Sequence, residues 1–313
     1  MCTNPINIIF LTGFSLLCSS VTFSQPEYDK PKTFDFITHI PKDALQIAKS
    51  PFSKNALEPL LVVAGTTTIL LFTDQSISNN IQDISEDAHF RSNENYKNVL
   101  SLRMRKKEIS IIKAPLNLNT AIYQFGQGFP SLLIGAGLFT MGKIHNDYRA
   151  LNTASQLAET FIIMGAGTQL LKRITGRQSP SDATRTGGAW HFLPSFKSFQ
   201  QYTPKYDAFP SGHLATIVST VTVLADNYPE NRWIKPVGYS MTGLLGLAMI
   251  NNKVHWTSDY PLAFALGYLC AKQVVKNNRR NSKETITKKE NKEFNVSLSY
   301  FNRTFLPTVV YHF

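Results

Sequence analysis

The chain has 313 residues, of which 43% are hydrophobic and 17% are charged. This composition is typical of a folded protein and excludes an intrinsically disordered chain. The formal net charge of +11 would suit a nucleic-acid partner, but the basic residues form no nucleic-acid-binding motif and many of them lie in residues 272–292. A solvated tail or attraction to anionic lipid explains the charge with fewer assumptions, so we expect no nucleic acid as a partner.

Residues 1–24 contain an apolar run, Ile6 to Cys18, followed by small and polar residues. We interpret this segment as an export signal cut near Ser24 or as an N-terminal anchor, although the usual positive flank is missing. Its removal would leave Cys270 as the only cysteine, so no intrachain disulfide is expected. This segment predicts a protein of the cell envelope, either membrane-associated or periplasmic.

Residues 25–127 form a predicted N-terminal extension. A short amphipathic helix is expected within residues 25–55, and the first strongly apolar segment runs from Pro59 to Thr73. The polar stretch from Ser76 to Lys113 lacks sustained periodicity and is interpreted as surface helix and loop.

Residues 128–276 form the predicted core. With the segment at 59–73, its apolar segments predict an all-α fold, a six-helix bundle. The five segments are Pro130 to Gly142, Ala154 to Leu171, Leu214 to Ala225, Pro236 to Ile250 and Pro261 to Val275.

Residues 277–313 are interpreted as a basic linker and a strand-like tail. Val296, Leu298 and Tyr300 alternate with serines, which is a strand pattern. A short β hairpin packed on the helical body is expected here.

The turn Phe209-Pro210-Ser211-Gly212-His213 precedes a segment without helix breakers. His213 is therefore predicted in the first turn of a helix, where unpaired N–H groups and the helix dipole attract anions. Ser211 would cap this helix, and Gly212 would allow close approach of a bound group. A second histidine, His255, precedes Asp259 by four residues, so the two can meet on one helical face. Two histidines, a carboxylate and nearby cations are the groups needed for phosphoryl transfer through a phosphohistidine.

The order of these motifs resembles the type 2 phosphatidic acid phosphatase superfamily, which shares its fold and anion site with vanadium haloperoxidases and bacterial class A acid phosphatases. The resemblance covers roughly residues 128–276 and implies a helical bundle without a cofactor or metal. The motifs are Lys172…Arg177…Pro180, Pro210-Ser211-Gly212-His213 and His255…Asp259.

The resemblance also implies the catalytic roles. His255 is the expected nucleophile, Asp259 holds its imidazole in the reactive tautomer, and His213 protonates the leaving oxygen and then activates water. The residues expected to bind phosphoryl oxygens are Lys172, Arg177, Ser211 and Gly212. We predict that these groups converge on one pocket, with the two histidines within about 10 Å of each other.

Two arginines of the family pattern are missing. Ser179 stands where the family has an arginine before the proline, and Ala248-Met249 stands where it has Ser-Arg. Arg177 is the predicted substitute, because the loss of a bidentate arginine is not neutral. The other nearby cations, Arg185, Lys197, Lys205, His191 and Lys253, are expected to be solvated.

The sequence leaves the membrane topology open. The apolar segments are shorter than the roughly 20 residues of a spanning helix. If all six spanned and residue 26 lay outside, the catalytic end would face the cytoplasm, whereas membrane members of the family typically face it outward. Either the N-terminal segment is no signal, or at least one helix does not span, or the protein is a periplasmic globule. We favour an envelope protein in contact with the membrane.

The leading functional hypothesis is a phosphomonoesterase, an acid phosphatase or lipid phosphate phosphatase, that acts on a phosphorylated lipid or a small phosphomonoester. One alternative is a catalytically impaired member that binds phosphate or lipid, which the missing arginines favour. Another is a vanadate-dependent haloperoxidase, against which the short chain and simple core argue. The sequence predicts no oligomeric state.

Overall fold

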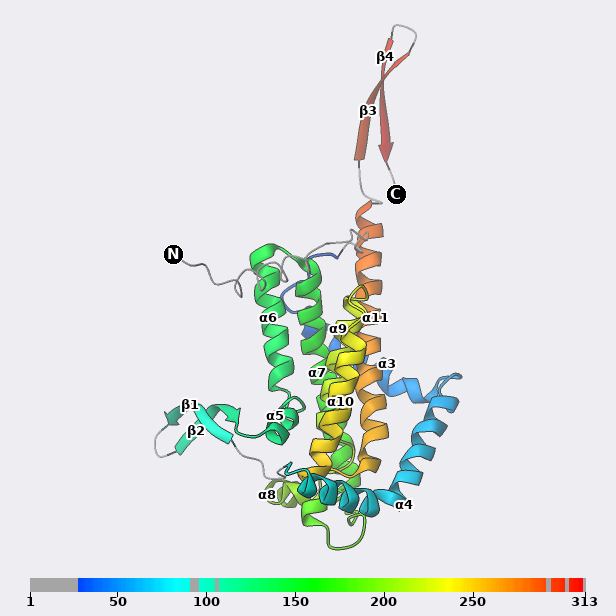
Figure 1. The fold of residues 1–313 in the computed structure, drawn as a ribbon. Helices are drawn as coiled ribbons and strands as arrows, with labels where there is room; N and C mark the ends of the chain where they lie inside the picture. The colour runs from blue at the N-terminus through cyan, green and yellow to red at the C-terminus, as the bar shows by residue number, and fades with distance from the viewer. Residues whose placement is uncertain (1–27, 91–95, 105–106, 291–293, 302–303, 312–313) are drawn as a thin grey trace, which may run out of the picture.

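The computed structural model describes residues 28–90, 96–104, 107–290, 294–301 and 304–311. Figure 1 shows a bundle of long helices that run side by side, which confirms the predicted all-α class. Each of the five apolar segments of the predicted core lies in one of these helices, and each helix is longer than its segment. They are α6 (Phe129–His145), α7 (Tyr148–Thr175), α9 (Gly212–Asn227), α10 (Ile234–Asn251) and α11 (Tyr260–Glu290).

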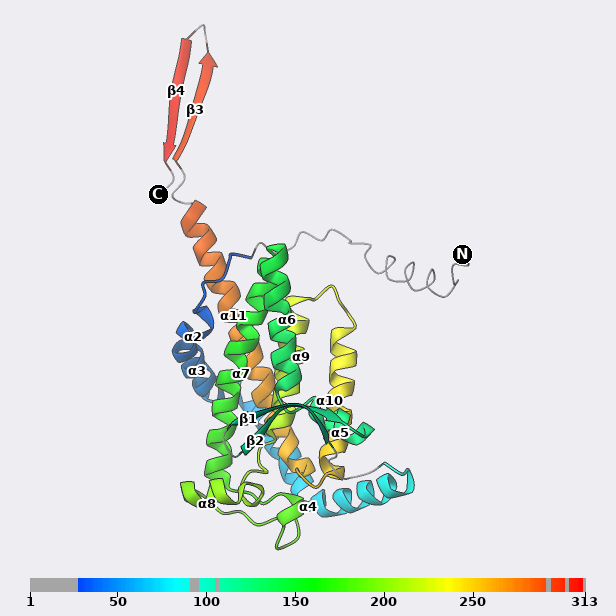
Figure 2. The same ribbon diagram turned by 90° about the vertical axis from the view of Figure 1, so that its left-hand side faces the viewer.

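The sixth helix, α4 (Leu57–Asp87), is bent. Its first limb slants in from outside the bundle and approaches α11 only toward the bend, and its second limb crosses the end of the bundle (Figures 1 and 2). The helix continues past the predicted end at Thr73 because no Gly or Pro interrupts residues 74–87. By length and composition, α4 is the single helix in the described part of the chain that is suited to cross a bilayer.

Shorter helices precede the core. The predicted amphipathic helix of the extension is α3 (Ile40–Lys49), which packs against α7 and α11. The remaining short elements are α2 (Asp35–Thr38), η1 (Ser50–Phe52) and α5 (Leu118–Gln124).

Surface helix and loop were predicted for residues 76–113. The helix is confirmed as far as Asp87, where α4 ends, but a β hairpin follows it, so the prediction was wrong for that part. Strand β1 (Tyr96–Met104) pairs antiparallel with β2 (Lys107–Pro115). Three β-branched isoleucines in β2, at positions 109, 111 and 112, favour the extended backbone. The alternation of apolar and polar residues in these two strands is too short and too polar for the sequence to distinguish it from a loop.

The C-terminal region differs from its prediction in two respects. Residues 277–290 are not a linker, because α11 continues through them to Glu290 without a Gly or Pro. The expected strands form as an antiparallel hairpin of β3 (Phe294–Phe301) and β4 (Thr304–Tyr311). Figure 1 shows this hairpin beyond the end of α11 and away from the bundle, so the prediction that it packs on the helical body was wrong.

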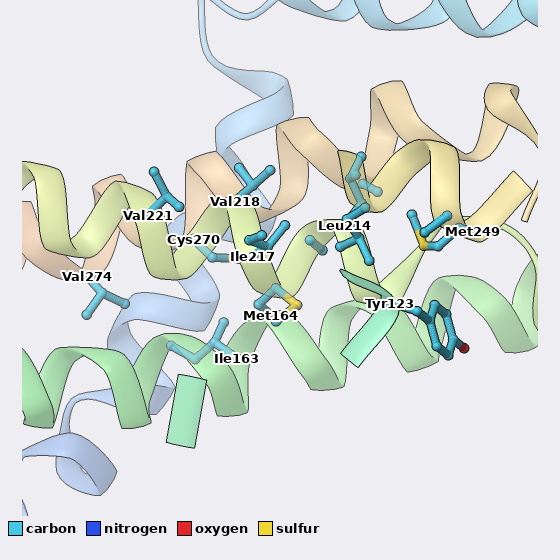
Figure 3. Close-up of a cluster of buried hydrophobic side chains, with 14 residues drawn as sticks. Tyr123, Ile163, Met164, Leu214, Ile217, Val218, Val221, Met249, Cys270 and Val274 are labelled. Carbon is cyan, nitrogen blue, oxygen red and sulfur yellow. The ribbon is translucent and has the colours of Figure 1, made fainter. Parts of the chain in front are cut away.

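The core is built around α9, which contacts α7, α10 and α11. Leu214, Ile217, Val218 and Val221 of α9 are all buried against the neighbouring helices (Figure 3). Each such side chain stabilises the fold by about 1.5–3 kcal/mol through removal of apolar surface from water. This packing holds the first turn of α9, and with it His213, in a fixed position.

Candidate active site

The predicted site residues lie at one end of the bundle, where α7 ends, α9 begins and η4 (Thr257–Asp259) leads into α11. The connection from α7 to α9 covers this end (Figure 1). It contains η2 (Pro180–Asp182), α8 (Phe196–Gln201) and η3 (Thr203–Lys205).

His213 is the second residue of α9, as predicted. The Ser211 side chain caps the helix by accepting a hydrogen bond from the Leu214 N–H at 3.3 Å. The Ser211 N–H donates to the Asp259 carbonyl oxygen at 3.1 Å, which ties the turn to η4. The His213 ring lies against Tyr123 of α5, with 4.9 Å between ring centroids. Burial, with the charges of His255 and Lys172, lowers the pKa of His213 well below its usual value.

His255 faces His213, with 5.6 Å between the ring centroids and 69° between the planes. Its Nδ1 lies 2.8 Å from the Ala208 carbonyl oxygen, an acceptor, so Nδ1 carries the proton. The other nitrogen, Nε2, is buried and has no hydrogen-bond partner among the described residues. Burial and the positive charge of Lys172 lower the pKa of His255 to about 3. The Nε2 lone pair is therefore available at neutral pH.

Asp259 is completely buried, and its carboxylate contacts Trp256, His255 and Arg177. Its Oδ2 accepts from the Trp256 N–H at 2.8 Å and lies 3.4 Å from His255 Nδ1. Its Oδ1 lies 2.5 Å from a terminal nitrogen of Arg177. Burial raises the pKa of Asp259 to about 7, while the Arg177 guanidinium opposes this rise. The shorter contact of Nδ1 is with the Ala208 carbonyl, so Asp259 supports the imidazole as a second, more distant acceptor.

Arg177 lies between two buried carboxylates. One terminal nitrogen donates to Asp259 and, at 2.6 Å, to the Ser258 hydroxyl. The other donates to Asp74 at 2.7 Å and to the Gly187 carbonyl oxygen at 2.8 Å. The guanidinium has no exposed surface, and both terminal nitrogens are already engaged by protein acceptors. This geometry suits a group that positions Asp259.

Lys172 lies in the last turn of α7 and is buried. Its ammonium is 3.4 Å from the Asp207 carboxylate. A β-carbon added at Gly212 would come within 3.9 Å of the same ammonium, so Lys172 lies beside the N-terminus of α9. A buried cation next to the unpaired N–H groups of a helix start is suited to bind an anion.

The positions of the two missing arginines are both buried. The Ser179 N–H donates to the Pro204 carbonyl oxygen. Met249 lies in the core, with its sulfur 3.5 Å from the Ser211 hydroxyl. Arg185, Lys197 and Lys253 are exposed, whereas Lys205 and His191 are half-buried.

The structure thus brings together Lys172, Ser211, Gly212, His213, His255 and Asp259, and it connects Arg177 to them through Asp259. Sequence reasoning missed Asp74, which is buried and also accepts from the Thr257 hydroxyl at 2.7 Å and the Ser258 N–H at 2.9 Å. The available signal was its place as the first charged residue after the apolar run 59–73.

Gly176 allows the connection to leave α7 at the site, and its replacement by alanine should be costly. Gly176 has φ +55°, and an added β-carbon would lie 1.9 Å from the His191 carbonyl oxygen. Gly187 has φ +72° and open space around it, so Gly187→Ala is the matched control. We expect Gly187→Ala to cost about 1–2 kcal/mol from the left-handed backbone alone. In chemical unfolding, Gly176→Ala should lose clearly more stability than Gly187→Ala. Equal losses of stability would contradict the close approach of the His191 carbonyl oxygen to Gly176.

Part of the chain matches a known protein family. The model of the PAP2 superfamily matches residues 153–283, which include Lys172, the Ser211–His213 turn, His255 and Asp259. Residues 153–283, which make up less than half of the chain, therefore resemble the PAP2 superfamily. The matched residues correspond to most of the core predicted from the motifs.

Among curated proteins, the chain is similar to a lipid A 1-phosphatase from Porphyromonas gingivalis, with 29% identity over 140 residues. That alignment covers 43% of this chain and 30% of the relative, so the chain matches less than a third of the relative's length. Among solved structures, it is similar to a transmembrane PAP2 type phosphatidylglycerolphosphate phosphatase from Bacillus subtilis, with 17% identity and a TM-score of 0.40. This likeness covers 79% of this chain and 98% of the other.

Proposed function

We propose that this protein is a phosphatase that hydrolyses a lipid phosphate monoester through a phosphohistidine at His255. The observation that carries the proposal is the state of His255. Its Nδ1 donates to a backbone carbonyl, its Nε2 has no partner among the described residues, and the ring faces His213. A neutral imidazole fixed in this tautomer is a nucleophile that needs no further activation.

In the first step, the His255 Nε2 lone pair forms a bond to phosphorus and the bond from phosphorus to the leaving oxygen breaks. His213 donates a proton to that oxygen. The pKa of His213 is low in the empty site, but a bound phosphoryl dianion favours the protonated form. In the second step, His213 takes a proton from water, the water oxygen attacks phosphorus, and the phosphorus–nitrogen bond breaks. Inorganic phosphate leaves and both histidines return to their starting state.

The phosphoryl oxygens are held by Lys172, by the Ser211 hydroxyl and by the Gly212 N–H in this proposal. Lys172 supplies the positive charge, and the start of α9 supplies oriented donors. The sequence predicted Arg177 as a ligand of the phosphoryl oxygens, but we propose a different role for it. Because its terminal nitrogens are engaged by Asp74 and Asp259, it acts as a positioning residue for the carboxylate behind His255.

The surface at the catalytic end supports a lipid as the substrate. Phe192, Leu193, Phe196 and Tyr202 of the connection between α7 and α9 are each more than 60% exposed. The same connection carries the exposed cations Arg185 and Lys197. Exposed apolar and aromatic side chains mixed with cations are typical of a surface that meets a lipid interface. The relative named for lipid A favours the same substrate class.

Purified protein should release inorganic phosphate from lipid phosphate monoesters in mixed micelles, and vanadate, which mimics the phosphoryl group, should inhibit it. Two soluble phosphomonoesters serve as comparison substrates. Failure to release phosphate from every lipid and soluble monoester would favour the alternative that the missing arginines support, a member that binds phosphate without turnover.

The exposed connection should matter for lipid presented in a bilayer. The double replacement Phe192→Asp with Leu193→Asp removes two apolar contacts with the interface, each worth about 1.5 kcal/mol or more. We therefore expect turnover of a vesicle-borne lipid phosphate to fall by a factor of about 100 or more. Turnover of a soluble phosphomonoester should stay within about twofold, because neither side chain is a predicted ligand of the phosphoryl group. The matched control is Phe52→Asp, since Phe52 is 89% exposed and lies in η1. Equal losses on both substrates would contradict the interfacial role.

A further inference from the structure

A cavity lies between α6 and α7, apart from the histidines. Its volume is 530 Å³, within the range of about 300–1,000 Å³ typical of small-molecule sites. Residues Ser219 and Thr220 of α9 form its inner side, and residues 30–36 cover part of it. Nothing in the proposed phosphatase chemistry uses this space.

The lining of this cavity has the character of a site for an amphiphile. Its walls are mostly apolar, with Leu132, Ala136 and Phe139 from α6 and Leu157 and Phe161 from α7. Three lysines, Lys30, Lys32 and Lys143, also line it and are exposed to solvent. Of the described residues that line the cavity, none is aspartate or glutamate. An apolar cavity with a purely cationic edge complements a molecule with a hydrocarbon chain and an anionic head.

The cationic edge lies far from the catalytic end. Lys143 is in the last turn of α6, and α7 then runs back toward the site, from Tyr148 to Thr175. Leu151, which lines the cavity, precedes Lys172 by 21 positions of one continuous helix. At 1.5 Å per residue this separates the two ends by about 30 Å. Figures 1 and 2 show the same arrangement, with the end of α6 and the connection containing α8 at opposite ends of the bundle.

We propose that this cavity binds an anionic lipid that is not the substrate, with one acyl chain between α6 and α7 and its anionic head on Lys30, Lys32 and Lys143. A head group held by these lysines cannot reach His255, because roughly the length of α7 lies between them. The bound lipid would fill the space between α6 and α7 and tie residues 30–36 to both helices. It should therefore stabilise the folded protein in proportion to its occupancy.

Two glycines of α6 provide a matched pair of variants. Gly135 lines the cavity, and an added β-carbon there would meet no atom within 4 Å. Gly137 also has no atom within 4 Å of an added β-carbon, but it does not line the cavity. Both replacements by leucine bring the same gain in helix propensity and the same added volume, and they differ in whether that volume enters the cavity.

The test uses the full chain in detergent, with phosphatidylglycerol as the anionic lipid and phosphatidylcholine as the uncharged comparison. In native mass spectrometry, wild type and Gly137→Leu should retain phosphatidylglycerol, and their unfolding temperature should rise as this lipid is added. Gly135→Leu should bind about tenfold more weakly or not at all. Lys32→Glu with Lys143→Glu should lose the preference for phosphatidylglycerol over phosphatidylcholine, with the fold intact.

Three results would contradict the proposed lipid site. Equal retention by Gly135→Leu and Gly137→Leu would show that the lipid binds elsewhere. Equal retention of both lipids by wild type would show that the lysines select no head group. If Gly135→Leu lost turnover of lipid phosphate but kept turnover of soluble phosphomonoesters, the cavity would hold the substrate's tail, and the proposal would be overturned. The measurements of lipid retention and of unfolding temperature need no turnover, so they test the lipid site even if the phosphatase proposal fails.

Discussion

Replacing His255 by asparagine should abolish phosphate release, with a loss in kcat of at least about 10⁴, the scale seen when a member of a catalytic unit is removed. Asparagine has no nitrogen lone pair that can take the phosphoryl group, so the covalent path is closed. The side chain stays neutral, as His255 is with its pKa lowered to about 3. Its amide N–H can still donate to the Ala208 carbonyl, so the fold should survive.

The matched control is His191→Asn. His191 lies in the connection between α7 and α9, and its ring packs edge-on against Tyr206 at 5.5 Å between centroids. It has no assigned part in the chemistry, so this variant should keep most of its activity. The rates should be measured with lipid and soluble substrates, beside unfolding curves for both variants. A His255→Asn protein that is folded and retains more than a few per cent of wild-type turnover would refute the nucleophilic role.

Replacing Arg177 by leucine should destabilise the protein by about 3–5 kcal/mol, because Asp74 and Asp259 would both remain buried without their cation. The loss should depend on pH. Burial already raises the pKa of Asp259 to about 7 against the opposing charge of Arg177, so without Arg177 this pKa rises further and the buried carboxyl costs most when it is ionised. The penalty should therefore be larger at pH of about 8 and smaller at pH of about 5, where Asp259 can be protonated. Chemical unfolding at the two pH values measures this difference.

The double variant Arg177→Leu with Asp74→Leu should recover part of the lost stability, since one unpaired carboxylate is removed with the guanidinium. Arg185→Leu is the control, because Arg185 is an exposed arginine of the same connection and should change stability by no more than about 0.5 kcal/mol. If Arg177→Leu kept wild-type stability and lost only a factor of about 100 to 1000 in kcat/KM, Arg177 would be the phosphoryl ligand that the sequence predicts.

The helices were predictable because each apolar segment is long and has no proline after its first residue, and breakers or polar turns separate the segments. Their ends were not predictable in the same way. The polar residues 74–87 and 277–290 stay helical simply because no Gly or Pro stops them. The hairpin of β1 and β2 depends on pairing between residues as far apart as Tyr96 and Pro115, which a local pattern does not reveal.

The site was predictable as far as local spacing determines it. The turn before His213 is a local feature that the structure shows as expected. His255 and Asp259 also lie close together, but the prediction that they meet on one helical face was wrong, because His255 precedes the short 3-10 helix η4 that Asp259 ends. The contacts of Arg177 with Asp74 and of His255 with the Ala208 carbonyl were not predictable, because they join residues 103 and 47 positions apart. The bend of α4 across the end of the bundle decides the first of these contacts, and the path of the connection before α9 decides the second.

The central claim, a phosphohistidine at His255, is tested most directly by trapping the intermediate. Enzyme mixed with a lipid phosphate labelled with ³²P and quenched in alkali, in which phosphohistidine survives, should carry label on the peptide that contains His255. His255→Asn should carry none. His213→Asn lacks both the acid for the leaving oxygen and the base for water, so it should gain the label more slowly and keep it longer than wild type. Phosphate release by wild type without label on any histidine, or with label that persists in His255→Asn, would contradict the account.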